Sequence, residues 1–238
     1  MSNDSSDVQA TVSGLFVHPV KSCAGVALRE ARLMDTGLDL DRAWMVVDAE
    51  GRFVTQREQP RMALVRPQIK VLEVVLRAPG MLALHLGINE VEKPARVQVW
   101  GDALDAWDMG DVAGQWFSDF LGRPGLRLAR FDPEVTRLAS KQWTGEVDAP
   151  IEFADGFPLL VVSEASLAEL NQRLAAAGGG LAQAQQRIEL LQLHALALLG
   201  GLRVLDHGTH HRDVLEAVDH PRVGGKPVAS GAAGLLDV

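Results

Sequence analysis

The sequence predicts a mainly β or α+β protein, with an N-terminal β-barrel followed by a mixed region that is atypical or truncated. Short apolar segments separated by turn signals run from residue 11 to about 110, a spacing typical of barrels and sandwiches. A clear amphipathic helical pattern follows only at 112–121, and a second helix is indicated after Ser163. The chain has 238 residues, 47% of them hydrophobic and 23% charged, which is enough for a sizeable buried core.

Turn signals divide the N-terminal region into short strands. Gly51 closes the turn Asp48-Ala49-Glu50-Gly51 at a position that tolerates positive φ. Ala78-Pro79-Gly80 has the signature of a type II turn. We therefore expect strands over 12–18, 43–47, 52–55, 69–77, 81–86, 97–100, 103–107 and 126–131.

The helical patterns lie later in the chain. An apolar face at i, i+4, i+5, i+8 and i+9 from Val112 predicts a helix that stops at Gly122. The apolar run 157–162 predicts a buried strand, and Ser163 is placed to cap a helix with Leu167, Leu170 and Leu174 on its buried stripe. Weaker patterns indicate short helices near 188–198 and 214–218.

Composition and charge exclude several classes of protein. A formal net charge of -8 argues against nucleic-acid binding, which needs a basic surface. No stretch reaches the roughly 18 apolar residues of a membrane span, and the first ten residues lack the apolar region of a signal peptide. The single cysteine, Cys23, excludes an intrachain disulfide and a cysteine zinc cluster. We expect a cytoplasmic protein with no membrane partner.

The composition changes at about Gly178. None of the seven Phe and five Trp residues lies beyond Phe157, and most of the seven histidines lie at or after His194. A reading-frame shift in a GC-rich gene would produce such a change, and the other two frames of the coding DNA test that hypothesis. Asp206 to His211 includes three imidazoles, but the spacing fits no metal-binding helix, so we predict no metal site there.

The most informative segment is His18-Pro19-Val20-Lys21-Ser22-Cys23-Ala24-Gly25. The Lys21 ammonium, the Ser22 hydroxyl and turn amides can together surround an oxyanion. Arg42, entering a predicted strand, offers a planar fork that suits phosphate. The alternative is that Lys21 and Arg42 are solvated turn charges, and Cys23 taken alone is more often a small core residue than a nucleophile.

A cluster of carboxylates later in the chain has a plainer interpretation. Glu146, Asp148, Glu152 and Asp155 surround Pro150. We interpret them as a solvated surface loop rather than as paired catalytic acids.

Several blocks in order resemble the N-terminal β-barrel of MOSC proteins, the relatives of the molybdenum-cofactor sulfurase C-terminal domain that include the mitochondrial amidoxime-reducing component and its bacterial counterparts. The matching blocks are 15–25, 41–48 and 53–58, and 153–167 is similar to the strand–helix element that opens the MOSC domain proper. We expect a disordered tail over 1–10. The resemblance implies a barrel-like domain over 11–128 and a partial MOSC-like domain over 129–238 that diverges after about residue 178.

The resemblance also implies a cofactor. Lys21, Ser22 and Arg42 match the positions that contact the molybdenum cofactor (molybdopterin), and backbone groups of 155–157 would line the same pocket. The implied activity is that of an oxidoreductase acting on N-hydroxylated compounds, with a small-molecule substrate and an electron-transfer protein as partners.

One part of the family pattern is missing from the sequence. The family's Arg-Pro-Asn strand is not found, and no cysteine follows Cys23 to ligate molybdenum. The alternative is therefore a non-catalytic cofactor-binding or anion-binding protein, or a degenerate relative. The catalytic residues, the substrate and the oligomeric state stay open.

Overall fold

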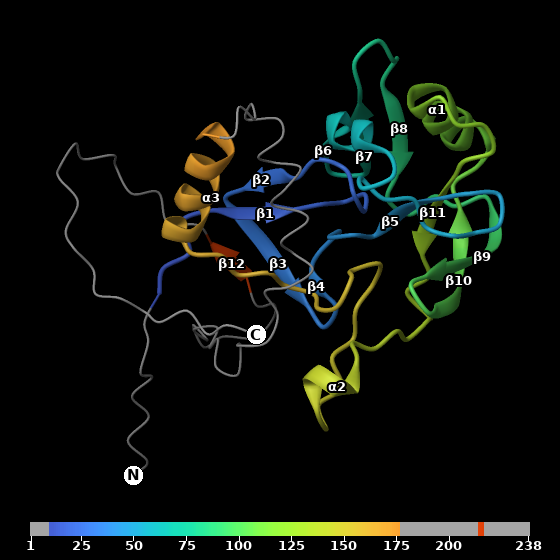
Figure 1. The fold of residues 1–238 in the computed structure, drawn as a ribbon. Helices are drawn as coiled ribbons and strands as arrows, with labels where there is room; N and C mark the ends of the chain where they lie inside the picture. The colour runs from blue at the N-terminus through green and yellow to red at the C-terminus, as the bar shows by residue number, and fades with distance from the viewer. Residues whose placement is uncertain (1–9, 177–213, 217–238) are drawn as a thin grey trace.

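A computed structural model describes residues 10–176 and 214–216 (Figure 1). Strands outnumber helices, which confirms the mainly β or α+β class. The strands are β1 (Leu15–Val17), β2 (Val26–Leu28), β3 (Glu30–Met34), β4 (Gly37–Leu38), β5 (Trp44–Val47), β6 (Arg66–Ile69), β7 (Glu73–Arg77), β8 (Leu84–Gly87), β9 (Lys93–Val99), β10 (Asp102–Asp108), β11 (Arg127–Phe131) and β12 (Val214–Glu216). The helices are α1 (Asp111–Leu121), α2 (Lys141–Thr144) and α3 (Glu164–Ala176), and a 3-10 turn spans Pro60–Leu64.

The strands within the described ranges pair into four sheets. Their orders are β1-β2, β5-β11-β10-β9, β12-β3-β4 and β6-β7-β8, and every pair of strands is antiparallel. None of these sheets closes on itself, so the predicted barrel is realised as separate sheets packed on one another.

The four-stranded sheet is buried on both faces at β5, which forms the centre of the core. Residues of β5 alternate between these faces, and all four are buried. Trp44 and Val46 join a cluster with Phe117 of α1 and Leu128 of β11. On the other face, residues including Met45 and Val47 join a cluster that contains Phe153. The second face therefore holds a segment from a distant part of the chain.

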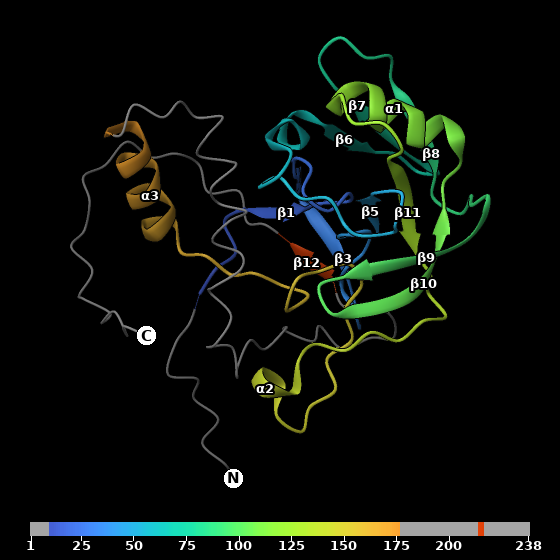
Figure 2. The same cartoon turned by 45° about the vertical axis from the view of Figure 1, so that its right-hand side comes forward.

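Two predicted helices are confirmed, but their predicted apolar faces are only partly buried. Val112 is exposed, and Leu167 and Leu170 are less buried than Leu174. Helix α1 ends directly before Gly122, and its buried residues include Trp116, Phe117 and Phe120. Helix α3 begins after Ser163, whose Oγ accepts a hydrogen bond from the Ser166 amide at 3.1 Å, as an N-cap does. Figures 1 and 2 show α3 far from α1.

Four predicted elements differ from the structure. Over 52–55 no strand forms, and Arg52 and Phe53 make isolated bridges instead. The run 69–77 is interrupted by a turn, because β6 ends at Ile69 and β7 pairs back onto it from Glu73. The predicted helix near 214–218 is replaced over its first part by β12, which pairs with β3. The expected buried strand over 157–162 has no strand structure, and Val161 and Val162 are about half exposed.

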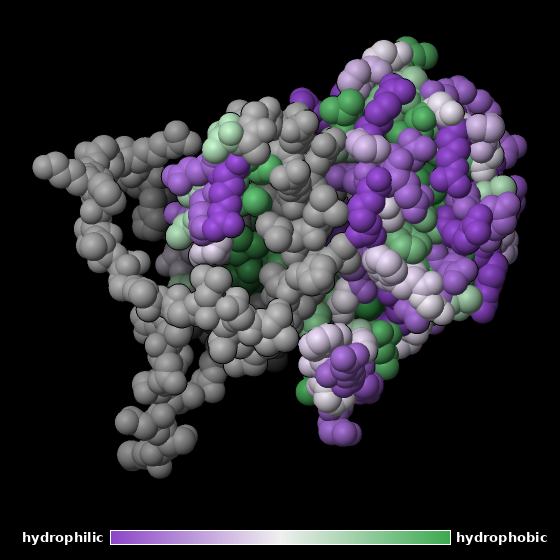
Figure 3. All heavy atoms as spheres, viewed as in Figure 1, coloured by the Kyte–Doolittle hydropathy of each residue, from purple (hydrophilic) through white to green (hydrophobic). Residues whose placement is uncertain are grey.

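The predicted helix near 188–198 and the histidine-rich segment lie outside the described residues, as does most of the N-terminal tail. Hydrophilic side chains cover much of the viewed face over β9 and β10 in Figure 3. Among the described residues, no helix combines the length and apolar character required to cross a membrane.

Candidate functional site

Three chain segments meet where β5 begins. The segment from His18 to Lys21 runs parallel to Arg42–Trp44: the Arg42 amide donates to the His18 carbonyl at 2.8 Å, and the Lys21 amide donates to the Trp44 carbonyl at 2.8 Å. The Phe153 amide donates to the Arg42 carbonyl at 3.3 Å. These backbone contacts place Lys21 and Arg42 next to each other and next to the segment 152–158, which we call the strap.

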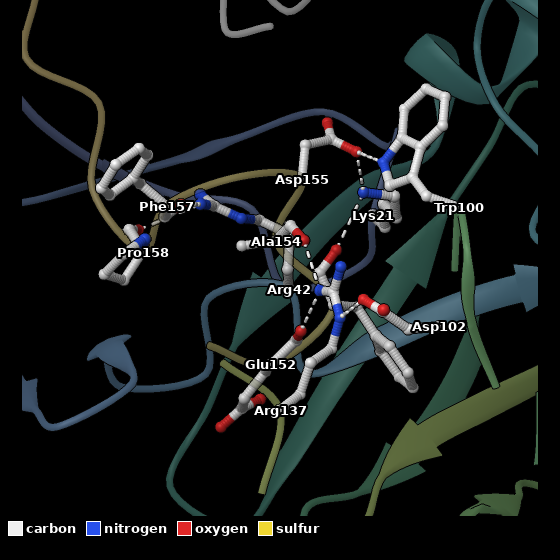
Figure 4. A network of polar contacts seen from close by, with 11 residues as sticks. Lys21, Arg42, Trp100, Asp102, Arg137, Glu152, Ala154, Asp155, Phe157 and Pro158 are labelled. Carbon is white, nitrogen blue, oxygen red and sulfur yellow. Dashed lines mark hydrogen bonds and ion pairs between the residues drawn. The ribbon is translucent and has the colours of Figure 1, made fainter. Parts of the chain in front are cut away.

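The Lys21 ammonium is buried and is held by the strap. Its side chain is 6% exposed, and Nζ donates to the Phe153 carbonyl at 2.8 Å and to Asp155 Oδ1 at 2.6 Å (Figure 4). Burial lowers the pKa of Lys21 to about 8, Asp155 partly opposes that shift, and Arg42 and Arg137 add to it. Lys21 is therefore mainly protonated at neutral pH, in a place where its charge needs an anionic partner.

The Arg42 guanidinium binds the same strap. Its Nη2 donates to the carbonyls of Phe157 at 3.3 Å and Pro158 at 3.0 Å, and its Nη1 forms an ion pair with Asp41. Arg42 therefore contacts the strap through backbone carbonyls. The predicted contact between backbone groups of 155–157 and a cofactor stays a prediction.

Ser22 lies in the turn that follows Lys21. Its φ is 66°, in the left-handed region, and its carbonyl accepts a hydrogen bond from Gln56 Nε2 at 2.7 Å. The structure therefore brings Lys21, Ser22 and Arg42 together, and we call these three residues the anion cradle. Their contact with a ligand stays a prediction.

Asp155 links the cradle to an aromatic side chain on the hairpin between β9 and β10. Its Oδ1 accepts from Trp100 Nε1 at 2.8 Å as well as from Lys21, and Figure 4 shows the carboxylate between the two donors. Burial raises the pKa of Asp155, but Lys21 and the Trp100 hydrogen bond outweigh that effect and hold the pKa below its usual range. Asp155 is therefore an anion at neutral pH.

Arg137 is a third cation on the strap, and sequence reasoning missed it. Its side chain is 6% exposed; Nη1 donates to the carbonyls of Glu152 at 2.7 Å and Ala154 at 2.6 Å, while Nε donates to Asp102 Oδ2 at 2.8 Å. Arg137 follows no motif and lies in a loop between β11 and α2, so no local pattern distinguishes it from a surface arginine.

The predicted solvated acidic loop is wrong for two of its four residues. Asp155 is tied to Lys21, and burial raises the pKa of Glu152, opposed by Arg130 and by a hydrogen bond from Thr36. The reason is that Phe153, between them, is fully buried in the core and forms an edge-to-face pair with Phe131 at 5.3 Å. That anchor draws its charged neighbours into the protein.

Exposed carboxylates remain where the prediction placed them. Glu146 and Asp148 are exposed, and Asp148 pairs with Lys141 of α2. Cys23 is fully buried beside the cradle, as expected of a small core residue. The described residues contain no group of three or more His, Cys, Asp or Glu side chains arranged to hold a metal ion.

Comparison with known proteins identifies the class. Residues 9–124 match the family model of the MOSC N-terminal beta barrel domain. This part of the chain is therefore a MOSC N-terminal beta barrel domain, and the matching region contains Lys21, Ser22 and Arg42.

Individual relatives extend the similarity beyond that domain. Mitochondrial amidoxime reducing component 2 of Bos taurus is 36% identical over 172 residues, which cover 69% of this chain and 51% of that protein. The rat protein of the same name is 29% identical over 223 residues, covering 90% of this chain and 63% of that protein. Molybdenum cofactor sulfurase of Bos taurus is 28% identical over 171 residues, covering 68% of this chain and 19% of that protein. The chain thus spans about half the length of the first of these relatives.

Proposed function

We propose that this protein binds a molybdenum cofactor through the phosphate of its pterin, using Lys21, Ser22 and Arg42, and acts as an oxidoreductase on N-hydroxylated compounds. One observation carries the proposal: two cations 21 positions apart in the sequence converge on a single short strap. The names of the relatives, an amidoxime reducing component and a molybdenum cofactor sulfurase, support the choice of cofactor and substrate.

The donor set of the cradle fits the phosphate end of such a cofactor. A buried ammonium and a guanidinium contact the same strap at neighbouring positions, and the turn at Ser22, which has left-handed φ, supplies a hydroxyl next to Lys21 in sequence. Arginine and lysine in this arrangement combine a bidentate fork with a mobile point charge. The set contains no thiolate, so it addresses the phosphate and not the metal.

Each residue has a distinct part in binding. Lys21 supplies a positive charge and three N–H donors, Arg42 orients a phosphate through its planar fork, and Ser22 adds a neutral donor. The Phe53 ring lies 5.7 Å from Lys21 Nζ and 4.9 Å from the Trp100 ring, so aromatic side chains limit water around the ammonium. The cofactor itself, when bound, supplies the redox chemistry. A small-molecule substrate and an electron-transfer protein are the partners that this activity requires.

A second function rests on the same cations. A non-catalytic cofactor or anion carrier needs only the cradle, which lies within the matched N-terminal domain. Molybdenum and pterin content of the protein made in a cofactor-competent host separate the two functions. Stoichiometric molybdenum with reductase activity supports the oxidoreductase, whereas pterin without molybdenum supports the carrier.

The role of the cradle is tested by the double variant Lys21→Ala, Arg42→Ala. We expect it to lose nearly all pterin and molybdenum measured in the wild-type protein, because both phosphate-binding cations are gone. The matched control is Lys70→Ala, Arg96→Ala, which removes two exposed cations and should leave cofactor content unchanged. Circular dichroism confirms that each variant is folded. Equal cofactor loading of the cradle variant and the wild type would refute the proposal.

A further inference from the structure

We propose that Asp155 regulates the anion cradle by acting as an internal competitor: its carboxylate occupies Lys21 in place of a phosphate oxygen, and an incoming anion displaces it. The proposal rests on the proposed function in that it assumes the cradle takes phosphate. It concerns a different residue and a different property, namely what the cradle binds before the ligand arrives.

The relative exposure of the two partners shows from which side an anion approaches. The Lys21 side chain is 6% exposed, the Asp155 side chain is 29% exposed, and the distance between Nζ and Oδ1 is 2.6 Å. The other contact of Nζ is the buried carbonyl of Phe153. An anion from solvent therefore reaches the ammonium at the place that the Asp155 carboxylate fills.

Asp155 has a second partner that can retain it after displacement. Trp100 Nε1 donates to the same oxygen at 2.8 Å, and the Trp100 side chain is exposed at the tip of the hairpin between β9 and β10. A rotation of the Asp155 side chain away from Lys21 would leave the carboxylate hydrogen-bonded and closer to water. Its charge then avoids the cost of an unpaired buried carboxylate.

The strap does not depend on Asp155 for its position. Arg137 holds the carbonyls of Glu152 and Ala154, Phe153 is fully buried, and Arg42 holds the carbonyls of Phe157 and Pro158. The backbone on both sides of Asp155 is thus anchored by other contacts. Displacement requires movement of one side chain and leaves the fold of the strap intact.

The surrounding charges favour exchange of the carboxylate for a phosphate. Lys21 has Arg42 and Arg137 close enough to lower its pKa by repulsion, so three cations face the strap. A carboxylate brings one negative charge to Lys21, whereas pyrophosphate brings more charge and can also reach a guanidinium fork. A phosphate binds only those molecules in which Asp155 has released Lys21. The apparent affinity for phosphate is therefore the intrinsic affinity multiplied by the fraction of such molecules.

Isothermal titration of the full chain with inorganic pyrophosphate at neutral pH tests this competition. We expect Asp155→Asn to bind pyrophosphate roughly tenfold more tightly than the wild type, because the amide is isosteric but carries no charge to hold Lys21. Asp148→Asn removes the same charge from an exposed carboxylate that pairs with Lys141, and it should bind as the wild type does. Thermal melts confirm that both variants are folded. If Asp155→Asn is not folded, Asp155→Ser replaces it as the variant without the carboxylate.

A Lys21→Met background separates competition from simple repulsion. If Asp155 competes for Lys21, adding Asp155→Asn to Lys21→Met leaves pyrophosphate affinity unchanged. An equal increase in both backgrounds would overturn the proposal, as would equal binding by Asp155→Asn and the wild type. If Lys21→Met binds pyrophosphate as tightly as the wild type, the cradle itself fails, and with it the proposed function. A third outcome rejects only the competition. In it, Lys21→Met binds pyrophosphate more weakly than the wild type, but Asp155→Asn does not raise the affinity of the protein that retains Lys21.

Discussion

At the scale of single residues, the charge on Lys21 is the feature with the clearest energetic consequence. Burial lowers its pKa from the ordinary 10.5 to about 8. Between these two values the unfolded chain binds more protons than the folded protein, so stability contributed by this site rises with pH. Below about pH 8 both states are protonated at Lys21, and the folded protein carries the full cost of a buried ammonium.

This titration gives a prediction for the variant Lys21→Met. The free energy of unfolding of the wild type, minus that of Lys21→Met, should increase by on the order of 2 kcal/mol from about pH 7 to about pH 10. Urea denaturation at several pH values measures the difference. A difference that stays flat or falls over this range would show that Lys21 is not buried as described. Asp155 remains ionised throughout the range, so it does not contribute to the slope.

At the scale of elements, the turn glycines show what the sequence predicts well. Gly51 and Gly80 were placed in turns from local patterns alone, and both adopt left-handed φ, 79° and 76°. Their surroundings could not be predicted, because they depend on distant strands. A Cβ at Gly51 would lie 2.5 Å from the Arg96 carbonyl oxygen, whereas a Cβ at Gly80 would meet nothing within 4 Å.

Alanine substitution of the two glycines should therefore give unequal results. Gly80→Ala carries only the conformational penalty, about 1 kcal/mol. Gly51→Ala adds a backbone clash with β9 and should destabilise the protein by about 3 kcal/mol or more. Thermal unfolding followed by circular dichroism compares the two directly. Equal losses of stability would mean that the turn at Gly51 moves freely away from β9.

The run 157–162 shows where local patterns fail. Its apolar residues favour a strand, but Pro158 has no N–H to donate to a ladder, and Arg42 takes the carbonyls of Phe157 and Pro158. The guanidinium comes from a position more than a hundred residues earlier. A single-sequence pattern contains no information about that partner, and the same holds for Arg137 and Asp155. The cradle residues themselves could be found because they lie in a motif.

At the scale of the whole molecule, Arg137 connects the strap to the central sheet. It joins Asp102, the first residue of β10, to the carbonyls of Glu152 and Ala154. The strap in turn carries Phe153, which completes the core on one face of the sheet. The position of the strap thus depends on one buried guanidinium as well as on apolar packing.

Removal of this guanidinium should affect the protein globally. Arg137→Met leaves two carbonyls without their donor and should lower the free energy of unfolding by about 3 kcal/mol. Arg96→Met removes an exposed arginine, 64% exposed and paired with Asp105, and should change stability by about 0.5 kcal/mol or less. Chemical denaturation of the three proteins measures the difference. Comparable effects of the two substitutions would contradict the conclusion that Arg137 holds the strap in position.

Within residues 10–176, four residues other than glycine have left-handed φ: Ser22, Leu40, Arg42 and Trp100. Ser22 and Arg42 belong to the anion cradle, and the Trp100 indole donates a hydrogen bond to Asp155 of the strap. Such backbone conformations cost about 1 kcal/mol or more each, so glycine at these positions would relieve strain. Selecting variants only for resistance to heat would therefore favour glycine at these positions. The side chains of Ser22, Arg42 and Trp100 would then be lost. Screening for pterin retention alongside heat tolerance would guard these three positions.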